Sequence, residues 1–278
     1  MDQGFEVVAA DQLGPDIRQL IVVAPRVAAH ARPGQFVIVR VDRSGERIPL
    51  TICAHDSEEE TITLVVQAVG RTTKQMCQLA VGDQLADVLG PLGRPTDINV
   101  YGRVVVVGGG LGTAIALPVA GALAAAGNSV HGIVGARDES HLILVDEMTA
   151  VCDSVTVMTD DGSTGRKGLV TEPLAESLET NDVDFVFVAG PIVMMAAAAE
   201  VTRPRRVKTV ASLNPIMVDG TGMCGGCRVR VGNETRFACV DGPEFDAHDV
   251  DFGLLATRNR AYLEFEACRL AETVSDHG

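Results

Sequence analysis

The sequence predicts a combined all-β and α/β fold: an antiparallel β-barrel, then a parallel-sheet domain, then a small C-terminal domain. Over the first hundred residues, short β-rich runs alternate with Gly, Pro and Asp turns, which is typical of a small barrel. From Asn99 onward, apolar strands alternate with helical stretches, which favours a parallel sheet. A glycine-rich segment with closely spaced cysteines follows. We therefore place the domains at residues 1–98, 99–215 and 216–278.

Several runs of the first domain have the composition of barrel strands. They cover Glu6–Ala9, Ile17–Val23, Phe36–Val41 and Thr61–Gln67. A further strand at Arg47–Thr51 would present a cation and a hydroxyl group. The segments Gly70–Thr73 and Gly90–Gly93 offer hydrogen-bond donors for a phosphate, although such short segments are more often plain turns.

The second domain begins with a βαβ unit. A Val-rich strand at Arg103–Val107 runs into Gly108–Gly112, an Ala-rich helix follows to about Ala126, and the next strand is Val130–Val134. Continuous apolar strands of this kind are buried on both faces of a parallel sheet. Further strands of the same sheet are expected at Val155–Met158 and Phe185–Val188.

The glycine run after the first strand of this sheet predicts a nucleotide site. A glycine-rich turn before a helix lets a dinucleotide pyrophosphate approach the backbone at the helix N-terminus. The third position of the usual dehydrogenase fingerprint is Thr113 instead of Gly, so the turn departs from that motif. Thr159–Ser163 and Ala189–Pro191 also follow strands, and ligands gather at this edge of an open α/β sheet.

The segment Val218–Cys227, closed by Cys239, has the ligand spacing of a two-iron cluster. Plant-type [2Fe-2S] sites follow Cys-x4-Cys-x2-Cys with a distant fourth Cys, and here the first position is Asp219. A carboxylate can ligate iron, which gives Asp219, Cys224, Cys227 and Cys239 as the ligands. Glycines between them allow the tight wrap that a cluster needs. The pattern predicts one-electron transfer.

Two alternatives use the same cysteines. A structural zinc site could take all three with Asp219 or His248 as the fourth ligand, but zinc ribbons usually supply a second close cysteine pair. The odd total of seven cysteines and the lack of a secretory signal argue against disulfides. The remaining cysteines are expected to be small buried hydrophobic residues: Cys53, Cys77, Cys152 and Cys268.

Composition excludes several classes of function. The 278 residues carry 23 Lys and Arg against 37 Asp and Glu, a formal charge of −14, which opposes binding to nucleic acid. No apolar run reaches the ~20 residues that a membrane span requires. The N-terminus does not have the pattern of a signal peptide. We therefore expect a cytoplasmic protein with no membrane span.

Together these segments resemble a known superfamily. The Arg-x-Pro-Leu-Thr strand, the Gly-Gly-Gly-x-Gly-Thr turn, the Thr-Asp-Asp-Gly-Ser segment and the two-iron loop are similar to those of the ferredoxin-reductase superfamily. Over Phe5–Phe265 the chain resembles the small subunit of NADH-dependent ferredoxin:NADP oxidoreductase, also called sulfide dehydrogenase. It is also similar to the electron-transfer subunit of dihydroorotate dehydrogenase. That branch carries Cys at the position of Asp219, so Asp219 favours the first branch.

The resemblance implies a set of cofactor-binding residues. Arg47, Pro49, Leu50 and Thr51 would line the isoalloxazine and ribityl chain of FAD, and Val69, Gly70, Arg71, Thr72 and Thr73 would hold its pyrophosphate. Gly109, Gly110, Gly112 and Thr113 would face NAD(H), with Asp160, Asp161, Gly190 and Pro191 nearby. Arg47 and Thr51 are the implied catalytic residues. Arg47 would tune the reduced flavin electrostatically, and the alternative for it is a surface ion pair.

The implied chemistry follows from counting electrons. A nicotinamide gives up two electrons as hydride, whereas a two-iron cluster accepts one at a time, so a flavin is needed between them. Arg137 and Asp138 follow the second strand of the parallel sheet and favour opposite nicotinamide cofactors. The resemblance decides the choice in favour of NAD(H).

Such a subunit needs a partner that receives its electrons. The resemblance implies a heterodimer with a larger glutamate-synthase-like flavoprotein that carries iron-sulfur clusters, through which ferredoxin and NADP(H) would react in electron bifurcation. Two alternatives stay open. One is the electron-transfer subunit of dihydroorotate dehydrogenase, and the other is a redox sensor that keeps the cluster without turning over nicotinamide. The intact Arg47, Thr51 and Gly108–Gly112 argue against the sensor.

Overall fold

The N-terminal part of the chain forms an antiparallel barrel. The computed structural model describes residues 4–180 and 182–261. The barrel sheet has the order β6-β1-β2-β5-β4-β3-β7. Its strands are β1 (Phe5–Gly14), β2 (Ile17–Val23), β3 (Phe36–Arg40), β4 (Ile48–Asp56), β5 (Thr61–Gln67), β6 (Gln84–Leu85) and β7 (Asp87–Leu92), with short helices α1 (Pro25–Ala28) and α2 (Arg71–Met76) between them. Leu20, Val22, Ile62 and Leu64 fill the core, because alternate strand residues face the same side.

The second part is a largely parallel sheet in the order β11-β10-β9-β8-β12-β13-β16. Its strands are β8 (Arg103–Gly109), β9 (Ser129–Ala136), β10 (Ser154–Thr159), β11 (Arg166–Lys167), β12 (Phe185–Ala189), β13 (Lys208–Ser212) and β16 (Glu244–Asp246). The helices are α3 (Thr113–Ala125), α4 (Val145–Val151), α5 (Thr171–Thr180) and α6 (Ile192–Thr202), with 3₁₀ turns η1 (Gly110–Gly112), η2 (Glu139–His141) and η3 (Arg203–Arg205). Central strands β8 and β12 are almost entirely buried, as expected for a sheet covered on both faces.

The direction in which strands are added to this sheet changes between β8 and β12. The chain builds β9 and β10 on one side of β8, then crosses to place β12 and β13 on the other side. The connection that leaves β8 therefore leads toward one edge of the sheet, and the connection that leaves β12 leads toward the opposite edge. Such a switch point leaves a crevice outside the carboxyl ends of the strands.

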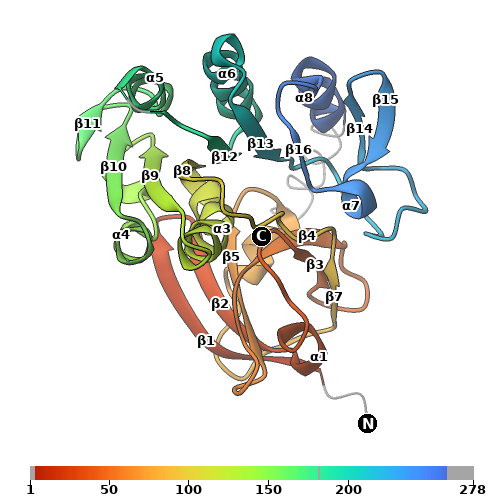
Figure 1. The fold of residues 1–278 in the computed structure, drawn as a ribbon. Coiled ribbons are helices and arrows are strands. Elements are labelled where there is room, and N and C mark those ends of the chain that lie inside the picture. The colour runs from red at the N-terminus through yellow and green to blue at the C-terminus, as the bar shows by residue number, and fades with distance from the viewer. Residues whose placement is uncertain (1–3, 181, 262–278) are drawn as a thin grey trace.

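Helix α3 lies between the parallel sheet and the barrel (Figure 1). Val119 and Leu123 pack on the sheet, and Ala114 packs on Ile17 and Val65 of the barrel. A helix that is covered on both sides can be apolar all round, which explains why α3 consists almost entirely of small and apolar residues. The barrel and the parallel sheet thus share a packed interface.

The C-terminal elements form a small unit at the edge of the parallel sheet. β14 (Arg228–Val231) and β15 (Glu234–Phe237) form a hairpin, and α7 (Ala238–Asp241), β16 and α8 (Phe252–Arg260) follow. β16 pairs antiparallel with β13, with Ser212 opposite Glu244. The Leu213 N–H donates to the Pro243 carbonyl at 2.9 Å. The segment between β13 and β16 therefore leaves the sheet edge and returns to it.

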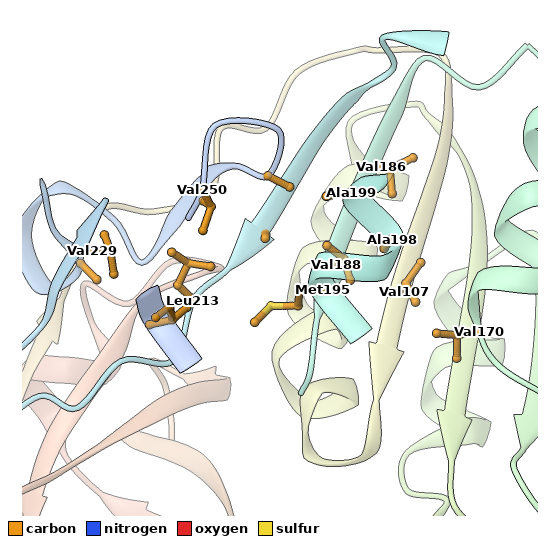
Figure 2. Packing of buried hydrophobic residues seen from close by; sticks show 14 of the residues in the cluster. Val107, Val170, Val186, Val188, Met195, Ala198, Ala199, Leu213, Val229 and Val250 are labelled. Atoms are coloured by element: carbon orange, nitrogen blue, oxygen red, sulfur yellow. The ribbon is translucent and has the colours of Figure 1, made fainter. Parts of the chain in front are cut away.

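One hydrophobic core runs from the parallel sheet into this C-terminal unit (Figure 2). It includes Val107 and Val188 in the sheet, Met195 in α6, and Leu213, Val229 and Val250 toward the C-terminus. Phe36 and Ile38 of the barrel belong to the same core. Because protein interiors are close-packed, the C-terminal unit has a fixed position relative to both sheets.

The fold class predicted from the sequence is confirmed by this architecture. The predicted strands coincide with β1, β2, β3, β5, β8, β9, β10 and β12, and β4 contains most of the run at Arg47–Thr51. The predicted domain boundaries stay predictions, and β16, which lies beyond the second of them, is a strand of the parallel sheet. In residues 4–180 and 182–261, no helix is long and apolar enough to cross a membrane.

Glu244 of β16 carries a carboxyl group where the C-terminal unit, the parallel sheet and the segment after the barrel meet. Its Oε1 accepts a hydrogen bond from Thr96 Oγ1 at 2.6 Å, and Gly34 lies so close that a Cβ there would collide with it. Burial raises the pKa of Glu244 to about 7, against the opposing effect of the Thr96 hydrogen bond, and the carboxylate of Asp97 adds to the rise. The folded protein therefore binds a proton at Glu244 more tightly than the unfolded chain does.

The stabilising effect of protonated Glu244 is present below its ordinary pKa of 4.5 and is lost as the pH rises through about 7. We expect Glu244→Gln to lack this part of the pH dependence and to exceed the wild type in free energy of unfolding by about 2 kcal/mol at pH ~8. Urea unfolding at pH ~5 and pH ~8 measures the difference. Glu179→Gln, on an exposed residue of α5, is the control. The same pH dependence in Glu244→Gln and the wild type would contradict the prediction.

Candidate functional site

A cavity of about 780 Å³ opens at the carboxyl edge of the parallel sheet and faces the barrel. Its wall comes from η1, from the ends of β9, β10 and β12, from β4, and from the segment after β13. This is the crevice that the switch in strand order creates, and its volume is typical of cofactor sites. Because both sheets contribute, a group held by the barrel would meet a group held by the parallel sheet inside it.

Glycines at the end of β8 and in η1 form the floor of the cavity. A Cβ at Gly112 would overlap the carbonyl of Ala189 at the end of β12, and a Cβ at Gly109 would collide with Met194. Gly110 has a φ of +53° and open space around it, so its backbone is accessible to a ligand. The first turn of α3 also lines the wall. The floor therefore combines bare backbone with a helix N-terminus, which suits a pyrophosphate.

Most of the residues predicted to face NAD(H) line this cavity. They are Gly109, Gly110, Gly112, Asp160, Gly190 and Pro191. Thr113 lies behind the turn, where it is 1% exposed and its Oγ1 has no hydrogen-bond partner among the described residues. Asp161 does not line the cavity. Its carboxylate accepts hydrogen bonds from the N–H and the hydroxyl of Ser163 at 2.9 and 2.7 Å. Asp161 therefore shapes the loop after β10.

The barrel contributes Pro49, Leu50 and Thr51 of β4 to the cavity wall. Phe36, which pairs with Thr51 across the β3–β4 ladder, also lines the wall. Arg47 precedes β4, is exposed, and lies outside the wall. The strand thus brings three of the four residues predicted to contact the flavin ring and ribityl chain to the cavity.

The predicted pyrophosphate segment, Val69, Gly70, Arg71, Thr72 and Thr73, lies outside the cavity wall, where the chain leaves β5 and enters α2. The Thr73 hydroxyl accepts hydrogen bonds from the N–H groups of Val69 and Gly70 at 3.1 and 2.8 Å. The Thr72 hydroxyl lies 3.3 Å from a carboxylate oxygen of Glu46, to which it donates. These bonds hold the turn and occupy three donor groups of the predicted segment: the N–H groups of Val69 and Gly70 and the hydroxyl of Thr72.

A charged network joins the parallel sheet to the barrel beside the cavity. His141 Nδ1 lies 2.7 Å from Asp138, and its Nε2 lies 3.5 Å from Asp16 in the β1–β2 turn. The side-chain hydrogen bond with His141 is the main cause that lowers the pKa of Asp138 to about 2. Arg137 Nε lies 3.3 Å from the same carboxylate. Asp138 is therefore charged at neutral pH and offsets the positive charge of Arg137.

The four predicted iron ligands lie in two pairs. Cys227 and Cys239 are 1% and 2% exposed, and their sulfur atoms are 3.2 Å apart. Cys224 is exposed, and its Sγ accepts a hydrogen bond from the Gly226 N–H at 3.4 Å. The Asp219 carboxylate accepts from the Cys224 N–H at 2.7 Å. One pair is therefore buried in the core, and the other lies on the exposed part of the loop.

Glycine is required in this loop at Gly220. Its φ is +74°, and a Cβ there would lie 2.6 Å from Leu92 and 2.8 Å from Ile38 of the barrel. Any other residue would combine backbone strain with a steric clash. The cluster loop therefore packs directly on strands β3 and β7.

The donor set fits a two-iron cluster. Three thiols and a carboxylate provide four anionic ligands once deprotonated. Burial, together with the neighbouring Cys227 thiol, raises the pKa of Cys239 to about 12, and a bound metal would reverse this by favouring the thiolate. Among the described residues, no three His, Cys, Asp or Glu side chains surround a single point. Structural zinc needs four ligands around one ion, whereas a cluster distributes its ligands over two irons, and the paired arrangement fits the cluster better.

The other residues considered at this site lie elsewhere. His248 Nε2 is 2.8 Å from the Thr202 hydroxyl in α6. Cys53 is buried, Cys77 and Cys152 are half-buried, and each is a free thiol. Cys268 lies outside the described residues.

Comparisons with known proteins connect these features to a family. Residues 214–251 match the family model for the iron-sulfur cluster binding domain of dihydroorotate dehydrogenase B. The chain is 44% identical over 261 residues to a dihydroorotate dehydrogenase B (NAD(+)) electron transfer subunit homolog of Thermotoga maritima, covering 94% of this chain and 92% of that protein. It is 32% identical to the dihydroorotate dehydrogenase B (NAD(+)) electron transfer subunit of Clostridium perfringens, over 81% of this chain and 89% of that protein. The chain belongs to the dihydroorotate dehydrogenase B electron transfer subunit family.

Solved structures agree with this membership in the electron transfer subunit family. The structure of NADH-dependent reduced ferredoxin-NADP oxidoreductase, reported for flavin-based electron bifurcation, matches with a TM-score of 0.93 at 41% identity and covers 99% of both chains. Phthalate dioxygenase reductase matches with a TM-score of 0.55 at 18% identity, over 82% of this chain and 85% of that chain, and shares the fold alone. The resemblance predicted from the sequence is confirmed.

As a member of the electron transfer subunit family, the chain is an oxidoreductase subunit whose cofactors are FAD, a [2Fe-2S] cluster and NAD(H). Its family name implies a larger partner that receives or supplies the electrons. The cavity shared by the two sheets and the cysteine loop beside it are the corresponding features of the structure.

Several residues that line the cavity belong to no recognisable sequence motif and were not predicted from the sequence. Ser212 ends β13, Asn214 and Met217 come from the segment after it, and Met194 comes from α6. The run that forms β13 is short and begins with Lys208, so it has no clear strand pattern. The one usable signal is that small and polar residues follow this short run, as they follow β12 at Gly190.

Proposed function

We propose that this chain oxidises NADH and passes the electrons through FAD and a [2Fe-2S] cluster to a larger subunit, as the small subunit of an electron-bifurcating NADH-dependent ferredoxin:NADP oxidoreductase. The observation that carries the proposal is Asp219, which stands at the first ligand position of the cluster loop and hydrogen-bonds the backbone of Cys224. This is the position at which the two branches of the family differ. The 41% identity to NADH-dependent reduced ferredoxin-NADP oxidoreductase, over 99% of the chain, supports the same branch.

The parallel sheet would hold the nicotinamide nucleotide. Gly109, Gly110 and Gly112 would accept its pyrophosphate against the backbone at the N-terminus of α3, with Asp160, Gly190 and Pro191 in the surrounding wall. Asp138 would favour the ribose hydroxyls of NAD(H), because its charge already compensates Arg137 and opposes a 2′-phosphate. Hydride transfer mainly requires the two rings to be held close and aligned.

The barrel would hold FAD, which when bound accepts hydride and releases electrons singly. Pro49, Leu50 and Thr51 would contact its ring and ribityl chain from the cavity wall. The segment 69–73 would hold its pyrophosphate at the first turn of α2. Arg47 lies outside the wall, and its role in tuning the flavin stays a prediction.

Strand β3 offers a direct connection between the cavity and the cluster loop. Phe36 lines the cavity, and Ile38 contacts the loop where a Cβ at Gly220 would collide with it. Residues two apart on a strand lie on the same face, about 6 to 7 Å from each other. The barrel would therefore place flavin and cluster on one short, rigid stretch of protein.

Electrons would leave from the exposed side of the cluster loop. Cys224 is exposed there, and Met223 and Val240 are 88% and 38% exposed. Apolar side chains around a redox centre suit a partner surface. The partner would be a larger glutamate-synthase-like flavoprotein with iron-sulfur clusters, through which ferredoxin and NADP(H) react.

A second candidate is the electron transfer subunit of a dihydroorotate dehydrogenase. It is favoured by the match of residues 214–251 to the cluster-binding domain of that enzyme and by the names of the curated relatives. Identification of the co-purifying large subunit distinguishes the candidates. A pyrimidine-forming barrel enzyme would overturn the first proposal.

Anaerobic addition of NADH to the purified chain tests the electron path. The flavin absorbance should bleach, and a low-temperature EPR signal of a reduced two-iron centre should appear. Asp219→Cys should change the shape of that signal, whereas Asp249→Cys, on an exposed residue outside the loop, should not. A colourless zinc protein would contradict the proposal. A coloured protein that does not respond to NADH would favour the redox sensor instead.

A further inference from the structure

Two arginines lie against the glycines of the cluster loop. Arg258 Nη2 donates a hydrogen bond to the Gly226 carbonyl at 3.2 Å, and the N–H of Gly226 donates to Cys224 Sγ at 3.4 Å. Arg258 is half-buried. Arg228 is exposed, and its Nη1 would lie 3.1 Å from a Cβ at Gly225. Of these two arginines, Arg258 is the one that is both bonded to the loop and partly shielded from water.

The packing of α8 fixes the position of Arg258. The Asp251 carboxylate caps the helix by accepting a hydrogen bond from the Leu254 N–H at 2.8 Å. Leu255 is 1% exposed and belongs to the hydrophobic core that contains Cys227 and Cys239. Figure 1 shows α8 beside the β14–β15 hairpin that follows the cluster loop. Because its helix is anchored in the core, the backbone of Arg258 is already fixed, and contact with the loop costs only side-chain freedom.

The residue next to Arg258 connects the same helix to the cavity. Asn259 Nδ2 donates a hydrogen bond to the Asn214 carbonyl at 2.9 Å, and Asn214 lines the cavity wall. In the last turn of α8, Arg258 therefore contacts the cluster loop, and the next residue, Asn259, contacts the wall of the proposed flavin and nucleotide cavity. This fixes Arg258 relative to both redox sites.

The charge of the proposed ligand set gives Arg258 an electrostatic role. Asp219 and three thiolates would surround a bound cluster with negative charge, and one-electron reduction of the cluster would add one more negative charge. The reduction potential of such clusters depends on nearby charge, hydrogen bonds and solvent exposure. A nearby cation stabilises the reduced cluster more than the oxidised one, because the reduced cluster carries the additional negative charge. A half-buried guanidinium does this more strongly than an exposed one, because it is screened less.

We propose that Arg258 is a positioning residue that holds the Gly226 peptide of the cluster loop and raises the reduction potential of the cluster through its positive charge. The inference rests on the proposed cluster ligands and on the proposed electron path, in which reduced FAD supplies the electron. It adds to that path a residue that sets how readily the cluster accepts the electron.

An anaerobic EPR-monitored redox titration of the purified full chain tests this role. At the wild-type midpoint, Arg258→Gln should shift the ratio of oxidised to reduced cluster about tenfold toward the oxidised form, which corresponds to a potential lower by about 59 mV for a one-electron couple. Arg260→Gln, which removes the same charge from an exposed position of the same helix, should leave the potential near that of the wild type. Arg258→Lys keeps the charge and should restore most of the potential.

Equal shifts in Arg258→Gln and Arg260→Gln would overturn the inference, because the effect would then be one of net charge alone. An unchanged potential in Arg258→Gln would overturn it as well. If Arg258→Gln loses the cluster, retention in Arg258→Lys supports the inference, and loss in both variants contradicts it. Iron and sulfide analysis of the wild type distinguishes failure of this inference from failure of the proposed function, because a wild type without iron and sulfide overturns the proposed function.

Discussion

Cys239→Ser is expected to lose the iron-sulfur cluster while it still binds FAD. Cys239 is 2% exposed, its sulfur lies 3.2 Å from that of Cys227, and both belong to the protein core. A serine hydroxyl is a much poorer ligand for an iron-sulfur centre than a thiolate. We expect iron and sulfide content to fall at least about tenfold, with loss of the NADH-induced EPR signal. Bleaching of the flavin by NADH should persist, because the cavity does not include this residue.

Cys152→Ser provides the matched control for this experiment. Cys152 is a half-buried free thiol at the end of α4, so the same atom is exchanged far from the cluster loop in sequence. It should retain the cluster and its EPR signal. The ligand assignment fails if Cys239→Ser keeps a full complement of iron with an unchanged signal, or if both variants lose the cluster to the same extent.

Gly112→Ala should damage the nucleotide site through backbone displacement. The added Cβ would overlap the carbonyl of Ala189 and lie 2.7 Å from Cα of Gly190, so η1 and the end of β12 must move apart. Overpacking of this kind costs about 1–3 kcal/mol of stability. Because the same two segments form the cavity floor, we expect the Kd for NADH to rise about tenfold or more. Anaerobic titration with NADH and urea unfolding measure the two effects.

Gly121→Ala is the control for this prediction. Gly121 lies on α3, and the nearest atom to an added Cβ would be a side-chain atom of Val151 at 3.8 Å, an ordinary contact. Alanine is also the better helix former. This variant should therefore keep NADH affinity and be at least as stable as the wild type. Equal NADH affinity in Gly112→Ala and the wild type would show that the glycine turn is not part of the nucleotide site.

The features that the sequence predicted correctly depend on local chemistry. A Val-rich strand such as Arg103–Val107 has few alternatives to the centre of a parallel sheet. A glycine at position 112 or 220 marks a place where another segment approaches closely: the backbone of Ala189 and Gly190 at Gly112, and barrel side chains at Gly220. The spacing of Asp219, Cys224 and Cys227 predicts a ligand loop from local sequence alone, and this ligand assignment stays a prediction.

The features that sequence patterns missed depend on contacts between distant segments. His141 approaches Asp16 of the barrel, and Arg258 reaches Gly226, pairs that carry no periodicity or motif. The position of Arg47 outside the cavity wall depends on where β4 begins. β13 and β16 are short strands whose pairing is set by packing. In each case the partner is chosen by tertiary structure, which local propensity does not encode.

The closed base of the cluster loop shows what fixes its two ends. The Leu213 N–H meets the Pro243 carbonyl and β16 pairs with β13 at the sheet edge, so backbone hydrogen bonds hold the ends of this 31-residue excursion together. These bonds help to offset the entropy lost in closing so long a loop. The two ends therefore do not depend on the cluster ligands alone for their separation, in contrast to small domains in which the metal ligands themselves bring the chain together.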